Sequence, residues 1–224
     1  GLAACLLGVP MIDQQARIRM TYAKIGNLRF IGHLDLQRLF ERALRRTNLP
    51  LKYTQGFSPH LRVNLASALP LGFIGEAEQM DFWLEEPIPL SEIAERLRVS
   101  LPKELVLKDL QSIDNQKPSL QAALLSSAYE IVLPSDTNQT EIQTRISDLE
   151  AQPALPFQRR KKTVDLKDLI ISWQLSERAG ELILKIEMKS TPLENGRPDE
   201  FLSLLNIDPA DCVIVRTKLT FLEE

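Results

Sequence analysis

Several features that mark common classes of protein are scarce or missing in this sequence of 224 residues. Two cysteines and two histidines are too few for a disulfide framework or for a dedicated zinc or iron–sulfur site. The longest apolar stretch, residues 2–10, is far shorter than the roughly 20 residues of a membrane-spanning helix. The motifs of P-loop nucleotidases, Rossmann dehydrogenases, zinc proteases and serine hydrolases are also absent. We therefore expect no membrane span, no metal site and no cofactor.

The cysteines and the N-terminal stretch predict a cytoplasmic location. Cys5 and Cys212 lie near opposite ends of the chain, and isolated thiols suit a reducing compartment. A disulfide bond between the two cysteines is the alternative. Residues 1–15 lack the basic start of a signal peptide, and we expect them to form a tail or linker. Met11 is a candidate natural start, and the beginning at Gly1 also suits a piece cut from a longer protein.

Charge is distributed unevenly along a chain of ordinary globular composition, with 44% apolar residues and a net charge of −3. Between Arg17 and Arg62 there are ten basic residues against only Asp35 and Glu41, a net charge of +8. The remainder holds 17 basic and 28 acidic residues, a net charge of −11. Such asymmetry indicates a surface that faces a polyanion. The alternative, a basic helix that pairs with acidic neighbours, stays open.

Hydrophobic periodicity predicts an α+β fold of two tandem ferredoxin-like units with antiparallel sheets. In residues 16–114, alternating apolar residues predict strands at 17–25, 61–66, 78–84 and 105–110. Apolar residues at helical spacing predict helices at 33–47 and 91–98. The resulting β-α-β-β-α-β order is that of the ferredoxin-like unit. A polar link follows at residues 114–119.

The same order recurs in residues 120–224. Strands are expected at 127–133, 163–175, 181–188 and 212–221, with helices at 137–149 and 198–205. Residues 177–180 end in glycine and predict a hairpin turn between the two central strands. Each unit is expected to form a four-stranded sheet with two helices on one face.

The first helix carries the clearest candidate site. Arg38, Arg42, Arg45 and Arg46 fall on the face opposite its apolar residues, and guanidinium groups suit phosphate oxygens. The candidate nucleic-acid-binding surface extends this stripe with residues that flank the helix, namely Arg29, Lys52, Phe57, His60 and Arg62. Phe57 would stack on a base if it is exposed, or would anchor its loop if it is buried. A second basic run at residues 159–162 is expected to be a solvated loop.

Both histidines lie in the basic segment and are the only weak candidates for catalysis. An imidazole titrates near neutral pH and would serve as acid or base in RNA cleavage. Alternatively, His33 caps the first helix, with Asp35 placed near the positive end of the helix dipole, and His60 is an ordinary loop residue.

Several motifs make the chain similar to a bacterial family. These are GNLRFIGHLDLQR at residues 26–38, RALRR at 42–46, LP at 49–50, GFSPH at 56–60 and ALPLG at 68–72, followed by Glu78 and Asp81. With them, the chain resembles the radical-SAM-linked proteins of unknown function, which occur alone or at the C-terminus of larger radical-SAM proteins. The resemblance covers about residues 16–220 and implies a radical-SAM enzyme or domain as partner. Two cysteines cannot supply the three thiolates of a radical-SAM cluster, so we expect no such chemistry from this chain alone.

These observations favour a non-catalytic RNA-binding or adaptor module that works with a radical-SAM enzyme or RNA-processing machinery. Two alternatives remain: a metal-independent ribonuclease that uses His33 or His60, and a protein-binding module that docks an acidic partner. The aromatic strand motif of RNA-recognition domains is absent, so base stacking on the sheet is not expected. The sequence does not specify the oligomeric state.

Overall fold

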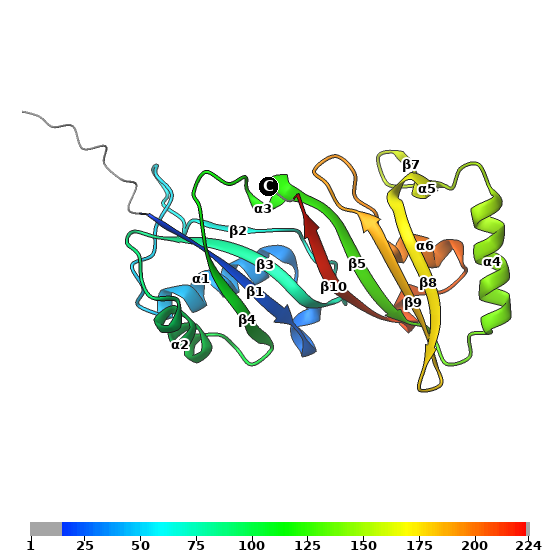
Figure 1. Ribbon diagram of the computed structural model, residues 1–224, viewed down its shortest axis with the longest axis horizontal. Coiled ribbons are helices and arrows are strands. Elements are labelled where there is room, and N and C mark those ends of the chain that lie inside the picture. Colours follow the sequence, from blue (N-terminus) through cyan, green and yellow to red (C-terminus); the bar gives the residue numbers. More distant parts are fainter. Residues whose placement is uncertain (1–14, 223–224) are drawn as a thin grey trace, which may run out of the picture.

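The computed structural model describes residues 15–222, which form a mixed α/β fold around one large, mostly antiparallel sheet (Figure 1). The part of residues 1–15 expected to form a tail therefore lies almost wholly outside the described residues. The first half contains β1 (Ala16–Lys24), η1 (Gly26–Phe30), α1 (His33–Arg46), β2 (Val63–Leu65), β3 (Ile74–Leu84), α2 (Leu90–Ser100) and β4 (Leu105–Ile113).

The second half begins with α3 (Leu120–Ala123) and ends with β10 (Val213–Phe221). Between them lie β5 (Leu124–Val132), α4 (Gln139–Ala151), β6 (Pro156–Gln158), β7 (Thr163–Asp165), α5 (Leu166–Leu169), β8 (Ile170–Arg178), β9 (Glu181–Lys189), α6 (Pro198–Leu204) and η2 (Pro209–Asp211). The predicted hairpin turn joins β8 to β9, and Ala179 and Gly180 both adopt positive φ there, as such a turn requires.

The two expected four-stranded sheets are joined, because the halves share one 8-stranded sheet. Its strands run in the order β4-β1-β3-β10-β5-β9-β8, and the short β2 also pairs with β3. β2 and β10 use the same edge of β3: β2 pairs with residues 80–82, and β10 runs parallel to Ile74 and Gly75. This short parallel ladder is what merges the halves.

The expected strand at residues 163–175 is also wrong in part. The side chain of Asp165 accepts hydrogen bonds from the backbone N–H groups of Lys167, at 3.0 Å, and Leu155, at 2.8 Å. This caps the single helical turn α5, which buries Leu166 and Leu169 in a small apolar cluster. The continuous strand, β8, starts only after that turn.

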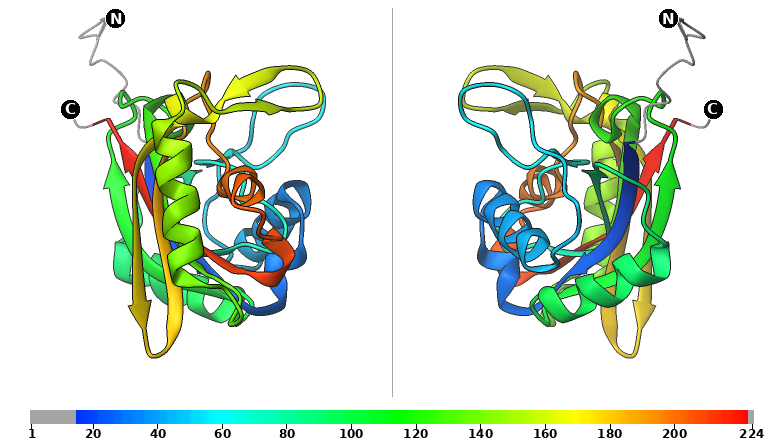
Figure 2. Two further views of the ribbon diagram at one scale, coloured as in Figure 1. Left: turned by 90° about the vertical axis from the view of Figure 1, so that its right-hand side faces the viewer. Right: turned by 90° about the vertical axis from the view of Figure 1, so that its left-hand side faces the viewer.

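Two hydrophobic cores lie on the helix-bearing face of the sheet, one in each half. In the first, Phe40 of α1 and Leu97 of α2 pack on Met20 and Phe82 of the sheet. In the second, α4 and α6 pack on β5 and β9 through residues that include Ile146, Phe201, Ile131 and Leu184. Figure 2 shows α1 and α6 on the same side of the sheet. The predicted apolar faces of the helices are therefore confirmed as their buried faces.

A buried ion pair connects the two halves where β3 meets β10. The guanidinium of Arg216 donates to both carboxylate oxygens of Glu78, at 2.7 and 2.5 Å, and both side chains are at most 3% exposed. Arg216 also donates to the carbonyls of Ser67 and Ala68. A Cβ on Gly75 would lie 2.5 Å from Cγ of Glu78, so a glycine is needed beside this carboxylate.

A second buried group fixes the link between the halves on the opposite face of the sheet. Asp81 is fully buried and accepts hydrogen bonds from Arg17 and Arg19. Arg17 also donates to the carbonyls of Lys117 and Pro118, at 2.7 and 2.9 Å. The polar link predicted at residues 114–119 is thus held against the first half.

Removing one partner of the Arg216–Glu78 pair should strongly destabilise the protein. Glu78→Gln or Arg216→Met leaves a buried charge without its partner, which costs about 3–5 kcal/mol of the free energy of unfolding. The double variant Glu78→Met with Arg216→Met should recover part of that loss. Urea denaturation followed by circular dichroism measures each value.

Glu130→Gln is the matched control, because its partners Arg178 and Lys185 are both exposed and such pairs contribute little. Should Glu78→Gln unfold at the same urea concentration as this control, the buried pair would not be what joins the halves.

Candidate nucleic-acid interface

The outward face of α1 carries the predicted arginine stripe. Arg38, Arg42, Arg45 and Arg46 are exposed, while the buried residues of the helix are Leu36, Phe40, Ala43 and Leu44. α1 therefore presents a basic outer face because its apolar residues recur at helical spacing on the opposite side.

The four arginines are not equally available to a ligand. Arg38 contacts Asp35 at 3.3 Å as an exposed pair, and Arg45 contacts the half-buried Glu41 at 3.8 Å, both within the helix. Arg46 donates to the carbonyl of Ser100 at 2.6 Å and thereby ties α1 to the end of α2. Arg42 makes no ion pair or hydrogen bond with any residue that the structure describes. Arg42 is accordingly the guanidinium most open to an anion, and Arg46 has a structural contact.

Counting charges along the sequence overstates the positive surface. Arg17 and Arg19 belong to the +8 segment, but their charges are opposed by the buried carboxylate of Asp81, which lies outside that segment. The alternative of a basic helix that pairs with acidic neighbours holds in part for α1, since Arg38 and Arg45 pair with Asp35 and Glu41. In β1, Arg17 and Arg19 likewise pair with Asp81.

The basic residues that flank α1 in the sequence have different neighbours. Lys52 is 3.7 Å from a carboxylate oxygen of Glu85. The guanidinium of Arg62 stacks 4.3 Å from the ring centroid of Trp83. Arg29 stacks on Phe30 in the same manner, at 4.7 Å. Stacked guanidinium groups keep their N–H edges available for a further acceptor.

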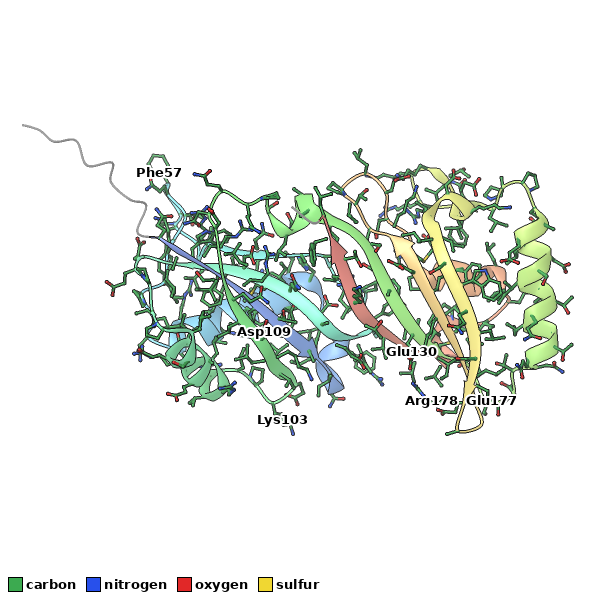
Figure 3. All side chains as sticks on the ribbon, in the orientation of Figure 1. Phe57, Lys103, Asp109, Glu130, Glu177 and Arg178 are labelled. Atoms are coloured by element: carbon green, nitrogen blue, oxygen red, sulfur yellow. The ribbon has the colours of Figure 1, made fainter. Side chains whose placement is uncertain are left out.

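The loop that holds Phe57 and His60 projects from the body on the same side of the sheet as α1 (Figure 2). Its base is closed by the backbone, since Thr54 donates to the carbonyl of His60 at 2.7 Å and Tyr53 pairs with Leu61. Phe57 is fully exposed, and Figure 3 shows it at the tip, pointing away from the body. The alternative of a buried loop anchor is therefore wrong, and Phe57 offers an open aromatic face.

The histidines do not form an acid–base pair in the described structure. His33 is the first residue of α1, Gly32 is the N-cap, and no side chain caps the helix, so the alternative role of His33 as a cap is wrong. Asp35 does lie in the first turn. Nδ1 of His33 is buried with no hydrogen-bond partner among residues 15–222. His60 is exposed, and the hydrogen bonds that the structure gives it are made by its backbone.

The basic run at residues 159–162 forms the turn between β6 and β7. Arg159 is held by Glu200, with Nε 2.7 Å from Oε1 and Nη2 2.6 Å from Oε2. Arg160, Lys161 and Lys162 are exposed at the tip. Only the last three residues fit the expected solvated loop, because Arg159 fastens the hairpin to α6.

A cleft of about 950 Å³ lies at the junction of the halves, and the sequence analysis did not identify it. Its lining comes from residues 29–30 and 68–73 of the first half and from residues 195–199 and 209–214 of the second, with Tyr129 and Arg216. Two of the motifs lie in its wall, through residues 29–30 of the motif at 26–38 and through the ALPLG motif at 68–72. Neither motif predicts a cleft, because the residues of the two halves come together only in the shared sheet.

Buried ionisable groups lie close to the Arg216–Glu78 pair. Burial, reinforced by the charge of Glu78, raises the pKa of Tyr22 well above its ordinary value. Burial also lowers the pKa of Lys24, whose ammonium donates to the carbonyl of Ile31 at 3.2 Å. Lys24 thus holds the segment between η1 and α1, and with it the start of the basic helix.

Within residues 15–222, no three His, Cys, Asp or Glu side chains gather as a metal site would require. Over the same residues, no helix is both long and apolar enough to cross a membrane.

Cys212 should react slowly with thiol reagents at neutral pH. Burial, with Asp211 and Asp208 nearby, raises the pKa of its thiol to about 11, so little of the reactive thiolate is present at pH 7.5. Its alkylation by iodoacetamide should accelerate about tenfold for each pH unit between pH 7.5 and 9.5. Mass spectrometry resolves the peptide that contains Cys212. Rapid alkylation at pH 7.5, at the rate of a free cysteine, would contradict this environment.

Comparisons with known proteins give a family and no function. No curated protein matches the chain. Among solved structures, an H/ACA RNP bound to a substrate RNA aligns with 11% identity and a TM-score of 0.47, over 95% of this chain and 50% of that one. The chain therefore spans half the length of that protein. An unknown protein from Galdieria sulphuraria aligns with 10% identity and a TM-score of 0.28, over 93% of this chain and 99% of that one.

The profile of one bacterial family matches residues 17–198, which include the helix-bearing first half and most of the second. The chain therefore belongs to DUF2344, a family of uncharacterized proteins conserved in bacteria.

Proposed function

We propose that this chain is a non-catalytic RNA-binding or adaptor module. The observation that carries the proposal is the exposed guanidinium of Arg42, which has no partner within residues 15–222 and is set between Arg38 and Arg45 on the outer face of α1. Like charges on neighbouring helical turns repel one another by a few tenths of a kcal/mol per pair. A bound polyanion removes this repulsion, and RNA combines phosphates for the arginines with bases for an exposed aromatic ring.

The position of the loop around Phe57 supports RNA over other polyanions. The loop lies on the same side of the sheet as α1 (Figure 2) and carries Phe57 at its tip (Figure 3), so one strand of RNA could contact both guanidinium groups and an aromatic ring. Arg62 and Lys52 flank the loop in sequence. Aromatic side chains beside arginines are the common elements of single-strand recognition.

We further infer that each half is a ferredoxin-like unit and that a radical-SAM enzyme or domain is the protein partner. The first inference rests on the strand orders β4-β1-β3-β2 and β10-β5-β9-β8. In both halves the four strands, counted along the chain, lie in the spatial order fourth, first, third, second. The second rests on the resemblance of the motifs at residues 26–72 to radical-SAM-linked proteins. Copurification with a radical-SAM enzyme from a bacterial lysate, identified by mass spectrometry, tests the partner.

Replacing Arg42 and Arg45 with Gln should weaken RNA binding without unfolding the protein, because both side chains lie on the exposed face of α1. Loss of two phosphate contacts should reduce the slope of log affinity against log salt by about one to two units. A filter-binding titration with a structured RNA at several salt concentrations measures both quantities.

Lys103→Gln with Lys108→Gln is the matched control, since it removes the same charge from exposed positions near and on β4. The proposal requires this control to retain the parent's slope. An Arg42 and Arg45 variant that binds RNA as tightly as the parent would rule out the α1 surface. Absence of any RNA binding at low salt would favour an acidic protein partner instead.

The ribonuclease alternative has one observation in its favour, the unpartnered buried Nδ1 of His33. Our proposal nevertheless predicts that purified protein leaves RNA intact, because no second acid or base is hydrogen-bonded to either histidine in the described chain. Incubation of labelled RNA with protein and EDTA, analysed by gel electrophoresis, tests this. Cleavage that disappears in His33→Gln or His60→Gln would establish the alternative.

A further inference from the structure

The central cleft lies directly beside the proposed RNA-binding face. Arg29 and Phe30 line it at the end of η1, and only two residues separate Phe30 from the start of α1. Its other walls come from both halves, and its volume of about 950 Å³ is within the range of pockets that bind small molecules. A strand bound along α1 would therefore pass close to a site large enough for one nucleotide.

Large apolar side chains are exposed where the first half contributes to the cleft. Phe30 is 59% exposed and Leu71 is 64% exposed, although both line the cleft. The guanidinium of Arg29 lies 4.7 Å from the ring centroid of Phe30 and holds that ring by a cation–π contact. The cleft thus offers an aromatic ring that the described chain leaves largely uncovered, of the kind on which unpaired bases stack.

Charged groups in the cleft complement the remainder of a nucleotide. Arg29 forms no ion pair with the described residues. Arg197 is oriented by Asp199, through contacts of 3.3 and 2.9 Å from Nε and Nη2, and its Nη1 has no described partner. Both guanidinium groups suit a phosphate. Asp211 also lines the cleft as an exposed carboxylate, which can accept from the N–H groups of a base.

Arg216 forms part of the wall of the cleft but has no free hydrogen-bond donor for a ligand. Its guanidinium is already engaged by Glu78, Ser67 and Ala68, so a ligand finds no free N–H there. Burial lowers the pKa of Arg216, but the charge and hydrogen bonds of Glu78 outweigh that effect and raise it, so the group stays charged. The ion pair therefore keeps the two walls of the cleft at a fixed separation.

We propose that this cleft binds one unstacked nucleotide of the RNA held by α1. The base packs on Phe30 and Leu71, and Arg29 with Arg197 contacts the adjoining phosphate. This inference rests on the proposed function, because it assigns a nucleotide-binding site to the same interface.

The test uses the full chain and a fluorescein-labelled single-stranded RNA of twelve mixed nucleotides. Phe30→Ala with Leu71→Ala should lower affinity about tenfold, a typical loss when a base-stacking side chain is removed. The salt slope should not change, because no charge is removed. Val99→Ala with Leu193→Ala is the matched control: both residues are exposed apolar side chains outside the cleft, and the pair should bind as the parent does.

A second measurement needs no variant. The parent chain is titrated with each nucleoside 5′-monophosphate while amide NMR signals are recorded. Signals of Gly72 and Gly196, which line the cleft, should shift, and those of Gly180 at the β8–β9 turn should not.

Circular dichroism melting of the Phe30 and Leu71 variant and of its matched control confirms that both are folded.

The outcomes separate the two proposals. Parent-like RNA affinity in the Phe30 and Leu71 variant, with weaker binding in the Arg42 and Arg45 variant, overturns the cleft site and leaves RNA binding in place. Equal losses in the cleft variant and in its matched control also overturn the cleft site. If the parent binds no RNA, the proposed function fails and this inference fails with it.

Discussion

The buried pair of Arg216 and Glu78 is the interaction on which the rest of the structure depends. β3 and β10 share only a short parallel ladder at Ile74 and Gly75, beside which Leu69 and Phe73 of the first half pack into the core of the second. The guanidinium adds two charge-assisted hydrogen bonds across that contact and satisfies the carbonyls of residues 67 and 68. Because the pair is almost fully buried, neither charge is tolerated without the other. Because Arg216 also lines the cleft, the same contact holds the two halves together and sets the spacing of the cleft walls.

Some arginines of this protein hold elements of the fold together, and others are free to bind a ligand. Arg17, Arg19, Arg46 and Arg159 are bound to carboxylates or carbonyls that fasten one element to another. Arg42 has no such partner in the described chain, and Arg29 only stacks on a ring. The exposed α1 face and the exposed aromatic side chains Phe57 and Phe30 lie toward the helix-bearing side of the sheet. A surface for RNA on that side uses the charges that folding leaves unneutralised.

Local patterns predicted the elements well and their assembly poorly. The apolar residues of α1 recur at helical spacing, so its boundaries and buried face followed from the sequence. Asp165, in contrast, caps a helical turn through contacts with Leu155 that a period-two pattern does not reveal. In β10, Arg216 lies two residues after the buried Ile214 and is itself buried, because Glu78 pairs with its guanidinium, although a charged residue in an alternating strand suggests an exposed position. Glu78 and Asp81 stood out in the motif comparison, but only the structure shows that they neutralise buried arginines.

Ultraviolet crosslinking of RNA to the unmodified protein, with the crosslinked peptides sequenced by mass spectrometry, would show which face of the sheet RNA contacts. We expect crosslinks in the peptides that contain Phe57 and Phe30 and in those of α1, all on the helix-bearing side. We expect none in β4 or β9. Crosslinks concentrated on those strands, or absent from residues 26–62, would contradict this expectation.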